Sequence, residues 1–183
     1  MTKKDPHATK AKLLHATVAV IMADGAANLT LEAVAKAAQV SKGGLLHHFP
    51  TKEALFYGLL ELGKQAWEAC LAVELSKEAS DQSGYWHRAY IHASFNQSPE
   101  DIQILHAMRR VVAIYPNVFE AWREAYAQPI PVPANDRLAL GRSLTIQLAC
   151  DALWFSELIG LPSMPSATQQ ALYAELLRLT YEH

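Results

Sequence analysis

The sequence has few cysteines and no long hydrophobic run, and each absence excludes a class of protein. Its two cysteines, Cys70 and Cys150, lack CxxC spacing, so they fit two free thiols in a reducing cytosol better than a disulfide or metal site. No apolar run reaches the roughly 18 residues that a membrane-spanning helix needs. The opening residues, MTKKDPHATK, do not contain the apolar core of a secretory signal. We therefore expect a cytoplasmic protein with no membrane partner.

The motifs of common enzyme classes are also missing. There is no G-x-S-x-G elbow, no H-E-x-x-H pair, no E-x-x-H pair and no phosphate-binding loop. We expect no catalytic residue, no cofactor and no metal site, and so not an enzyme. Two alternatives to a DNA-binding protein stay open at this point: an all-α enzyme, and a protein that binds a small molecule but not DNA.

The remaining composition favours a folded, helical protein. Apolar residues make up 51% of the chain and charged residues 19%. Alanine and leucine dominate and alternating β-branched runs are absent, so the expected fold class is all-α. Periodicity, caps and turn residues predict nine helices: 7–24, 31–38, 42–48, 52–75, 85–96, one starting at Pro99, 116–128, 135–159 and 166–181. The first three form a head (residues 1–50) and the other six a body (residues 51–183).

Charge is divided unevenly between these two parts. Residues 1–52 contain seven lysines and three carboxylates, which gives +4, whereas the remainder has nine basic and 15 acidic residues, which gives −6. A basic head on an acidic body is typical of a protein whose head meets a polyanion such as nucleic acid. Charge alone leaves a chance fluctuation open.

The segment from Thr30 to Glu53 has the pattern of a helix-turn-helix. Thr30 and Ser41 are expected to cap two short helices joined by the turn Gln39-Val40-Ser41. The side chains expected to pack the two helices together are Ala35, Val40, Leu45 and Phe49. Small and basic residues are left facing outward: Lys42, Gly43, Gly44, His47 and His48. A helix of this kind fits a major groove about 12 Å wide.

The stretch VSKGGLLHHFPTKEAL resembles the recognition helix and following linker of the tetracycline-repressor (TetR) family, and the nine-helix layout agrees. The resemblance implies a homodimer that blocks a promoter by binding double-stranded operator DNA, until a small-molecule inducer binds the body. It implies phosphate contacts for Thr30, His48 and Lys52, and phosphate or base contacts for Lys42 and His47. With the cap and the glycine pair, the expected DNA-binding residues are Thr30, Ser41, Lys42, Gly43, Gly44, His47, His48 and Lys52.

Two residues, Gln39 and Leu46, depart from the family pattern. The glycine pair and the histidine pair of the predicted recognition helix can also be explained without DNA binding. Gln39 stands where the family often has glycine, which costs about 1 kcal/mol if the position is left-handed. Leu46 stands where the family usually has tyrosine. The Gly43-Gly44 pair allows close approach of the backbone to DNA, or is simply a weak point in the helix. His47-His48 could be surface histidines; because adjacent helical residues point apart, shared metal binding is not expected.

All four tryptophans lie in the body. The stretches QAWEAC, YPNVFEAWREAY and CDALWF are similar to those of multidrug-binding members of the family. That similarity implies that Trp67, Trp122 and Trp154 contact a flat, apolar and often cationic molecule, with Met108 and Phe155 as further wall residues. Aromatic residues also fill ordinary cores, so packing is the alternative role for each tryptophan.

Asp151 shares a helical face with leucines. A carboxylate on an apolar stripe could balance a cationic ligand. Alternatively, it could have a structural role and pair with Arg109, Arg110 or Arg142. We include Asp151 among the ligand-binding candidates and leave the structural role open.

The last two predicted helices are very apolar for surface elements. Their leucines are Leu138, Leu140, Leu144, Leu148, Leu153, Leu172, Leu176 and Leu177. Two such helices, paired with their symmetry mates, would form a four-helix dimer interface. Burial within one subunit is the alternative, and some of these leucines must serve it.

Overall fold

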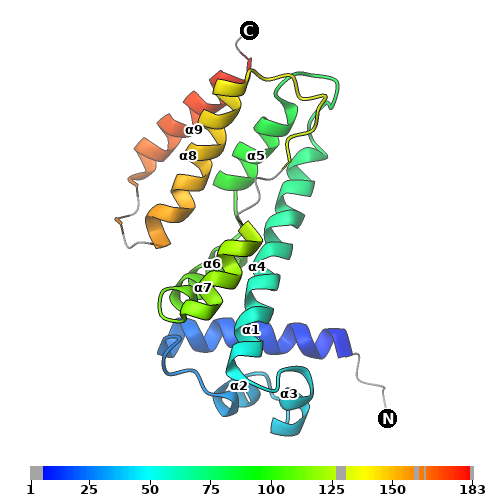
Figure 1. Ribbon diagram of the computed structural model, residues 1–183, viewed down its shortest axis with the longest axis vertical. Helices are drawn as coiled ribbons and strands as arrows, with labels where there is room; N and C mark the ends of the chain where they lie inside the picture. Colours follow the sequence, from blue (N-terminus) through cyan, green and yellow to red (C-terminus); the bar gives the residue numbers. More distant parts are fainter. Residues whose placement is uncertain (1–5, 127–130, 159–160, 163, 182–183) are drawn as a thin grey trace. The chain divides into compact units, whose positions relative to one another are not determined.

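The computed structural model describes residues 6–126, 131–158, 161–162 and 164–181, and in this part every regular element is a helix. The all-α prediction is therefore confirmed. Figure 1 shows the nine helices of the described residues: α1 (Pro6–Asp24), α2 (Leu31–Ala37), α3 (Lys42–His48), α4 (Lys52–Leu75), α5 (Tyr85–Phe95), α6 (Pro99–Val112), α7 (Pro116–Tyr126), α8 (Leu140–Leu158) and α9 (Ser166–Tyr181).

The chain forms two compact units, and the long helix α4 contributes to both. The first unit, Met1–Ala66 with Ser98–Pro129, contains α1, α2, α3, the first part of α4, α6 and α7. The second unit, Trp67–Gln97 with Ile130–His183, contains the end of α4 with α5, α8 and α9. None of the described helices is long and apolar enough to span a bilayer. The predicted domains, residues 1–50 and 51–183, are assigned by expected function and have other bounds than these compact units. That boundary stays a prediction.

Helix starts in the first unit follow the predicted caps. Thr30 Oγ1 accepts a hydrogen bond of 3.1 Å from the backbone N–H of Ala33, and Ser41 Oγ accepts one of 3.1 Å from Gly44. Ser98 caps α6, with Pro99 as the first helical residue, and the Asp101 side chain accepts from the Ser98 backbone N–H to complete a capping box. Each cap satisfies a backbone donor that has no partner inside its helix, so these boundaries are fixed locally.

The predicted helix 135–159 begins only at Leu140, so its first turn was predicted wrongly. The carboxylate of Asp136 instead accepts the backbone N–H groups of Gly84 at 2.7 Å and Trp86 at 2.9 Å, at the start of α5. Asp136 therefore serves as a distant cap for α5, and its own segment stays non-helical. Helix α7 is described as far as Tyr126, and residues 127 and 128, the end of the predicted helix 116–128, lie outside the described residues.

In the first unit, α1 packs against α2 and α6, and α2 packs against α3, as Figure 1 shows. The buried face of α1 is an apolar stripe that contains Leu13, Leu14, Val18 and Ile21. Burial of such a side chain contributes about 1.5–3 kcal/mol. The end of α1 is held by Arg110 of α6, whose Nη1 donates to the carbonyl oxygens of Ile21 at 2.9 Å and Met22 at 3.0 Å.

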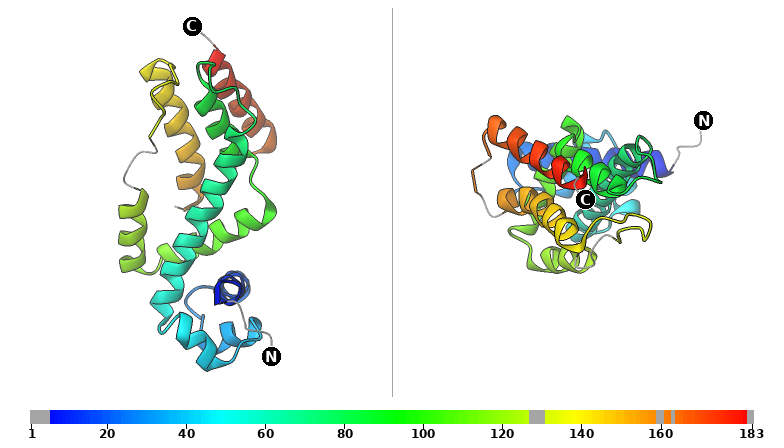
Figure 2. Two further views of the ribbon diagram at one scale, coloured as in Figure 1. Left: turned by 90° about the vertical axis from the view of Figure 1, so that its right-hand side faces the viewer. Right: turned by 90° about the horizontal axis from the view of Figure 1, so that it is seen from above.

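In the second unit, α5 is the central helix, and Figure 2 shows it beside α8 and α9. Its residues from Tyr85 to Ile91 are all buried, including the basic side chains of His87 and Arg88. A helix buried on every side must find partners for its polar groups inside the protein. Arg88 does so in part: Glu78 Oε2 accepts from Nε at 2.7 Å and the Ser83 carbonyl accepts from Nη1 at 3.0 Å, whereas Nη2 is buried without a hydrogen-bond partner among the described residues.

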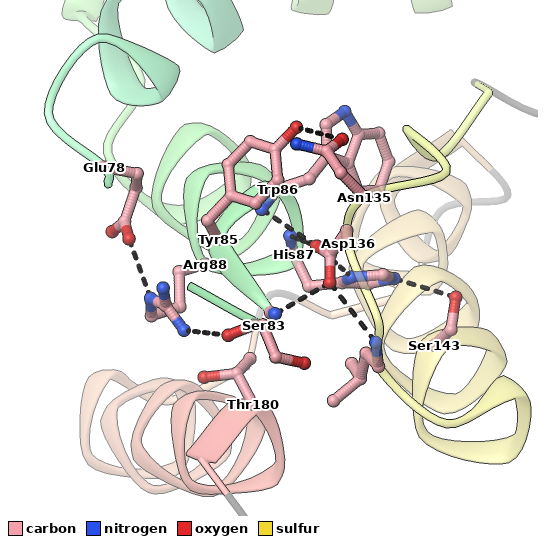
Figure 3. Close-up of polar contacts among 12 residues, drawn as sticks. Glu78, Ser83, Tyr85, Trp86, His87, Arg88, Asn135, Asp136, Ser143 and Thr180 are labelled. Carbon is pink, nitrogen blue, oxygen red and sulfur yellow. Dashed lines mark hydrogen bonds and ion pairs between the residues drawn. The ribbon is translucent and has the colours of Figure 1, made fainter. Parts of the chain in front are cut away.

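His87 joins three segments of the second unit in a buried polar network (Figure 3). Its Nδ1 lies 3.0 Å from Asp136 Oδ2 and its Nε2 lies 2.7 Å from Ser143 Oγ of α8. Burial lowers the pKa of His87 although Asp136 opposes this. For Asp136, burial acts to raise the pKa, but hydrogen bonds from Gly84 and His87 outweigh it and lower the pKa overall. A neutral His87 that donates to Asp136 and accepts from the Ser143 hydroxyl satisfies all three groups.

Candidate nucleic-acid interface and ligand-binding residues

The two short helices α2 and α3 form the predicted helix-turn-helix. The turn is closed by a hydrogen bond of 3.0 Å from the Val40 N–H to the Ala35 carbonyl. Gln39 has a φ of +51°, the left-handed conformation anticipated for a position where the family often has glycine. Leu45 is 0% exposed and Phe49 3%, which confirms that they anchor α3 to the interior.

The outer face of α3 carries the residues predicted to face outward. Lys42, Gly43 and His47 are exposed, whereas Gly44 and His48 are half-buried. Thr30 and Ser41, which cap α2 and α3, are also exposed. Since the permanent charge and the least bulky residues share one exposed face, a polyanion can come close to the backbone of α3.

The two glycines of α3 differ in what surrounds them. A Cβ atom added to Gly44 would lie 3.0 Å from Val40 Cγ1 and 3.2 Å from Ser41 Oγ, so packing within the turn already favours a small residue there. A Cβ atom added to Gly43 would meet nothing within 4 Å. Packing within the described chain therefore gives a reason for a small residue at position 44 but none at position 43, where both explanations considered from the sequence stay open.

Lys52 is held more firmly than the sequence suggested. Its Nζ donates to the Ala27 carbonyl at 3.1 Å and lies over the rings of Phe56 and Tyr115, at 5.6 and 5.3 Å from their centroids. The side chain is half-buried, so its ammonium is fixed beside the loop after α1. An ammonium has three donors, and one carbonyl occupies one of them, so Lys52 keeps donors for a phosphate.

The predicted ligand-binding residues are divided between the two compact units. Met108 and Trp122 belong to the first unit, Trp67 and Asp151 belong to the second, and the side chains of Trp154 and Phe155 lie outside the described part. Met108 is 3% exposed and packs on Gly63, while Trp122 is half-buried beside Phe119, with ring centroids 5.9 Å apart. Met108 and Trp122 therefore both have packing roles in their own unit.

Tyr90 of α5 links two of the ligand-binding candidates, and sequence reasoning missed it. Its ring stacks on Trp86, with centroids 5.0 Å apart, and meets Trp67 edge-on at 5.5 Å. Its hydroxyl donates to Asp151 Oδ1 at 2.6 Å. Burial, and then the Asp151 carboxylate, raise the pKa of Tyr90, so the phenol stays protonated. Asp151 thus has a tyrosine partner, which neither of the two roles considered from the sequence included.

The leucines predicted to lie in the last two helices fall into two groups. Leu140, Leu144 and Leu148 are 74%, 48% and 67% exposed, and their four-residue spacing places them along one face of α8. By contrast, Leu176 is buried and Leu138, Leu153, Leu172 and Leu177 are half-buried. Some of these leucines therefore serve burial within the subunit, and three form an exposed apolar row on α8.

The described residues contain no group of three His, Cys, Asp or Glu side chains arranged to hold a metal ion. His47 and His48 contact each other edge-on, with ring centroids 5.3 Å apart.

Comparison with known proteins identifies both halves of the chain. Residues 13–58 match the family model described as bacterial regulatory proteins, tetR family, and residues 84–181 match the model described as tetracyclin repressor-like, C-terminal domain. No curated protein sequence shows significant similarity to the chain.

Solved structures share the fold at low sequence identity. One is the multidrug binding protein EbrR complexed with imidazole, at 19% identity and a TM-score of 0.58, covering 98% of this chain and 93% of that one. A second is the regulator PfmR from Thermus thermophilus, at 17% identity and a TM-score of 0.59, covering 93% and 99% of the two chains. A third, a family member from Streptomyces coelicolor, has 18% identity and a TM-score of 0.62, with 95% and 99% covered.

Proposed function

This chain belongs to the tetracycline-repressor family of bacterial regulators, and on that premise we propose that it is a homodimeric repressor released from its operator by an apolar or cationic molecule. The observation that carries the proposal is the exposed α3. Leu45 and Phe49 hold this helix to the head, while Lys42, Gly43 and His47 face solvent. A helix so anchored, with a basic and compact outer face, has the form that enters a major groove.

Within this proposal, α3 and its neighbours contact double-stranded DNA. Thr30, His48 and Lys52 bind phosphates, whereas Lys42 and His47 bind phosphates or base edges. Gly43 allows the α3 backbone to come close to the duplex, with Ser41 and Gly44 beside it at the start of the helix. Few of these side chains can read bases, so specificity depends also on DNA shape.

The proposed dimer forms through the exposed row of α8 leucines. Three large apolar side chains that are this exposed on one helix face form an apolar patch, and such patches are uncommon on the surface of monomeric proteins. Burial against a second copy removes them from water, and a two-fold axis lets the same row serve both subunits. The two recognition helices would then need a separation of roughly 34–36 Å, one turn of DNA.

The proposed inducer site uses the aromatic residues of the body together with Asp151. In the second unit the candidates are Trp67 and Asp151, and Tyr90 joins them because it contacts both. Met108, Trp122, Trp154 and Phe155 stay candidates from the sequence alone. A carboxylate beside aromatic rings suits a flat organic cation. EbrR, which shares the fold, is described as a multidrug binding protein. The inducer must bind more tightly to the dimer conformation in which the two heads have a separation that does not fit DNA. An inducer with equal affinity for both conformations would not change DNA binding.

The test is a binding titration with duplex DNA from upstream of the chain's own gene, repeated over a range of salt concentrations. Affinity that falls steeply with salt is expected if lysines of the head contact phosphates. Addition of lipophilic cations should quench tryptophan fluorescence and release the DNA. Quenching without any DNA binding would favour the alternative, a small-molecule-binding protein without a DNA function. Since repressors act on the chromosome, we also propose a cytoplasmic location.

A further inference from the structure

Glu32 and Lys42 form an ion pair across the turn of the helix-turn-helix. Glu32 is the second residue of α2 and Lys42 is the first residue of α3, and Lys42 Nζ donates to Glu32 Oε1. The side chains of Lys42 and Glu32 are 60% and 64% exposed, so the pair lies on the surface of the head and not in its core. The hydrogen bond from Lys42 lowers the pKa of Glu32 below its ordinary value.

This pair changes the charge that α3 presents to DNA. The sequence of α3 is KGGLLHH, so Lys42 is its only permanent cation, and the two histidines carry charge only when protonated. The Glu32 carboxylate therefore neutralises the single fixed positive charge that this helix would bring to the groove. A second exposed acid, Glu53, occupies the equivalent position in α4, as the second residue of that helix.

Ion exchange determines what such a pair does to binding. When a free lysine binds DNA, a condensed cation leaves the phosphate, and this release gives protein–DNA affinity its salt dependence. When the lysine is already paired with a carboxylate, it exchanges one anion for another. The carboxylate left behind attracts a cation of its own, so the net release of ions for that contact is close to zero.

Building on the DNA-binding function proposed above, we propose that Glu32 competes with DNA for Lys42 and thereby sets both the affinity and the salt dependence of binding. Glu32 is thus a second determinant of DNA binding in the head, and it acts against binding. An exposed ion pair shifts an equilibrium by at most about fivefold. A dimer has two heads, so the shift for the dimer is at most about 25-fold.

The experiment measures binding of full-length protein to a fluorescent duplex from upstream of its own gene and to a random-sequence duplex. The variants are Glu32→Gln, Lys42→Ala, the double variant and Glu53→Gln. Glu53 is a matched control because it is also exposed and is also the second residue of a threonine-capped helix. Substitution at either position therefore removes one acid and one favourable interaction with a helix dipole.

Glu32→Gln is expected to tighten binding to both duplexes by about 3- to 25-fold, and more than Glu53→Gln does. The slope of log affinity against log salt should steepen by about 0.9 for each head. In the Lys42→Ala background, Glu32→Gln should increase DNA affinity by no more than Glu53→Gln does. Equal effects of the two glutamine variants, or weaker binding by Glu32→Gln, would overturn this inference while the DNA-binding function stands. Absence of DNA binding by the unmodified protein at low salt would instead overturn the proposed function.

Discussion

The thioether of Met108 lies directly on Gly63: a Cβ atom added to Gly63 would be 2.0 Å from Met108 Sδ and 2.9 Å from its Cε. Gly63→Ala should therefore destabilise the protein by about 1–2 kcal/mol, because crowding of the core costs about 1–3 kcal/mol and the gain in helix propensity returns up to about 1. Urea unfolding measures the change. In the Met108→Ala background the added methyl group should become stabilising, and a Gly63→Ala protein as stable as the unmodified one would contradict the close contact.

Gly43→Ala is expected to have opposite effects on stability and on DNA binding. Nothing lies within 4 Å of the added methyl group, so the helix should gain up to about 1 kcal/mol in stability. If the backbone of α3 comes close to DNA, the same methyl group should weaken operator binding by about tenfold or more, the effect of crowding by about 1.4 kcal/mol. Unfolding and binding titrations on one preparation separate the two effects. Unchanged affinity would return Gly43 to the role of a weak point in the helix.

Much of the head could be predicted because its determinants are local. The caps Thr30 and Ser41 lie three residues from the N–H groups that they accept, and the inward residues Leu45 and Phe49 lie one helical turn apart. The left-handed conformation of Gln39 follows from its position in the turn. Contacts over three or four residues follow from helix geometry alone, so periodicity and cap residues are sufficient to place them.

The features that escaped prediction depend on contacts between distant residues. Asp136 accepts N–H groups some 50 residues earlier in the chain, and this contact, not helix propensity, decides where α8 begins. Tyr90 reaches Asp151 over a sequence separation of 61 residues. Glu32 and Lys42 are only ten residues apart, but their pairing depends on the crossing of α2 and α3. No pattern in the sequence gives such distances before the fold is known.

The protein is expected to lose stability as pH falls below about 6.5, partly through His87. Burial lowers the pKa of His87 below its ordinary 6.5, so the unfolded chain binds this proton at a higher pH than the folded protein does. Above pH 6.5 the stabilisation from neutral His87 is fully present. Below pH 6.5 the free energy of unfolding falls by up to about 1.4 kcal/mol per pH unit for each histidine whose pKa burial lowers, until the pKa of that histidine in the folded protein is reached. His106, whose pKa burial also lowers, contributes in the same direction. The lowered pKa of Asp136 adds a separate loss below its ordinary 3.8.

His87→Gln should reduce this loss without abolishing it, because His106 remains. The measurement is the urea midpoint at several pH values between about 5 and 8, compared between the variant and the unmodified protein. Ser143→Ala is a second variant: it removes the hydroxyl within 2.7 Å of Nε2, which should cost about 1–3 kcal/mol at neutral pH. A pH dependence identical in the unmodified protein and in His87→Gln would show that His87 does not titrate in this range.

Leu148→Glu should convert the proposed dimer to monomers. Leu148 is 67% exposed on the apolar row of α8, so a charge there is tolerated by the single subunit but would be buried in the interface. Leu161→Glu is the control, since Leu161 is also exposed, at 54%, but lies outside α8. Light scattering after size-exclusion chromatography gives the mass. If the interface is correct, only Leu148→Glu is monomeric, and it binds operator DNA more weakly; a dimeric Leu148→Glu protein would place the interface elsewhere.

Asp151→Asn should weaken the binding of lipophilic cations by about tenfold and leave the binding of a neutral aromatic molecule of similar size unchanged. The amide oxygen can still accept the hydrogen bond from Tyr90, so the variant removes the charge while it keeps the contact with α5. Tyr90→Phe removes the donor instead and leaves the carboxylate without its 2.6 Å partner, so the cation should bind at least as tightly as before. Quenching of tryptophan fluorescence reports both titrations, since Trp67 and Trp86 contact Tyr90. If Asp151→Asn keeps full affinity for every cation tested, or loses the cation and the neutral molecule equally, Asp151 has a structural role and the charge of the inducer is recognised elsewhere.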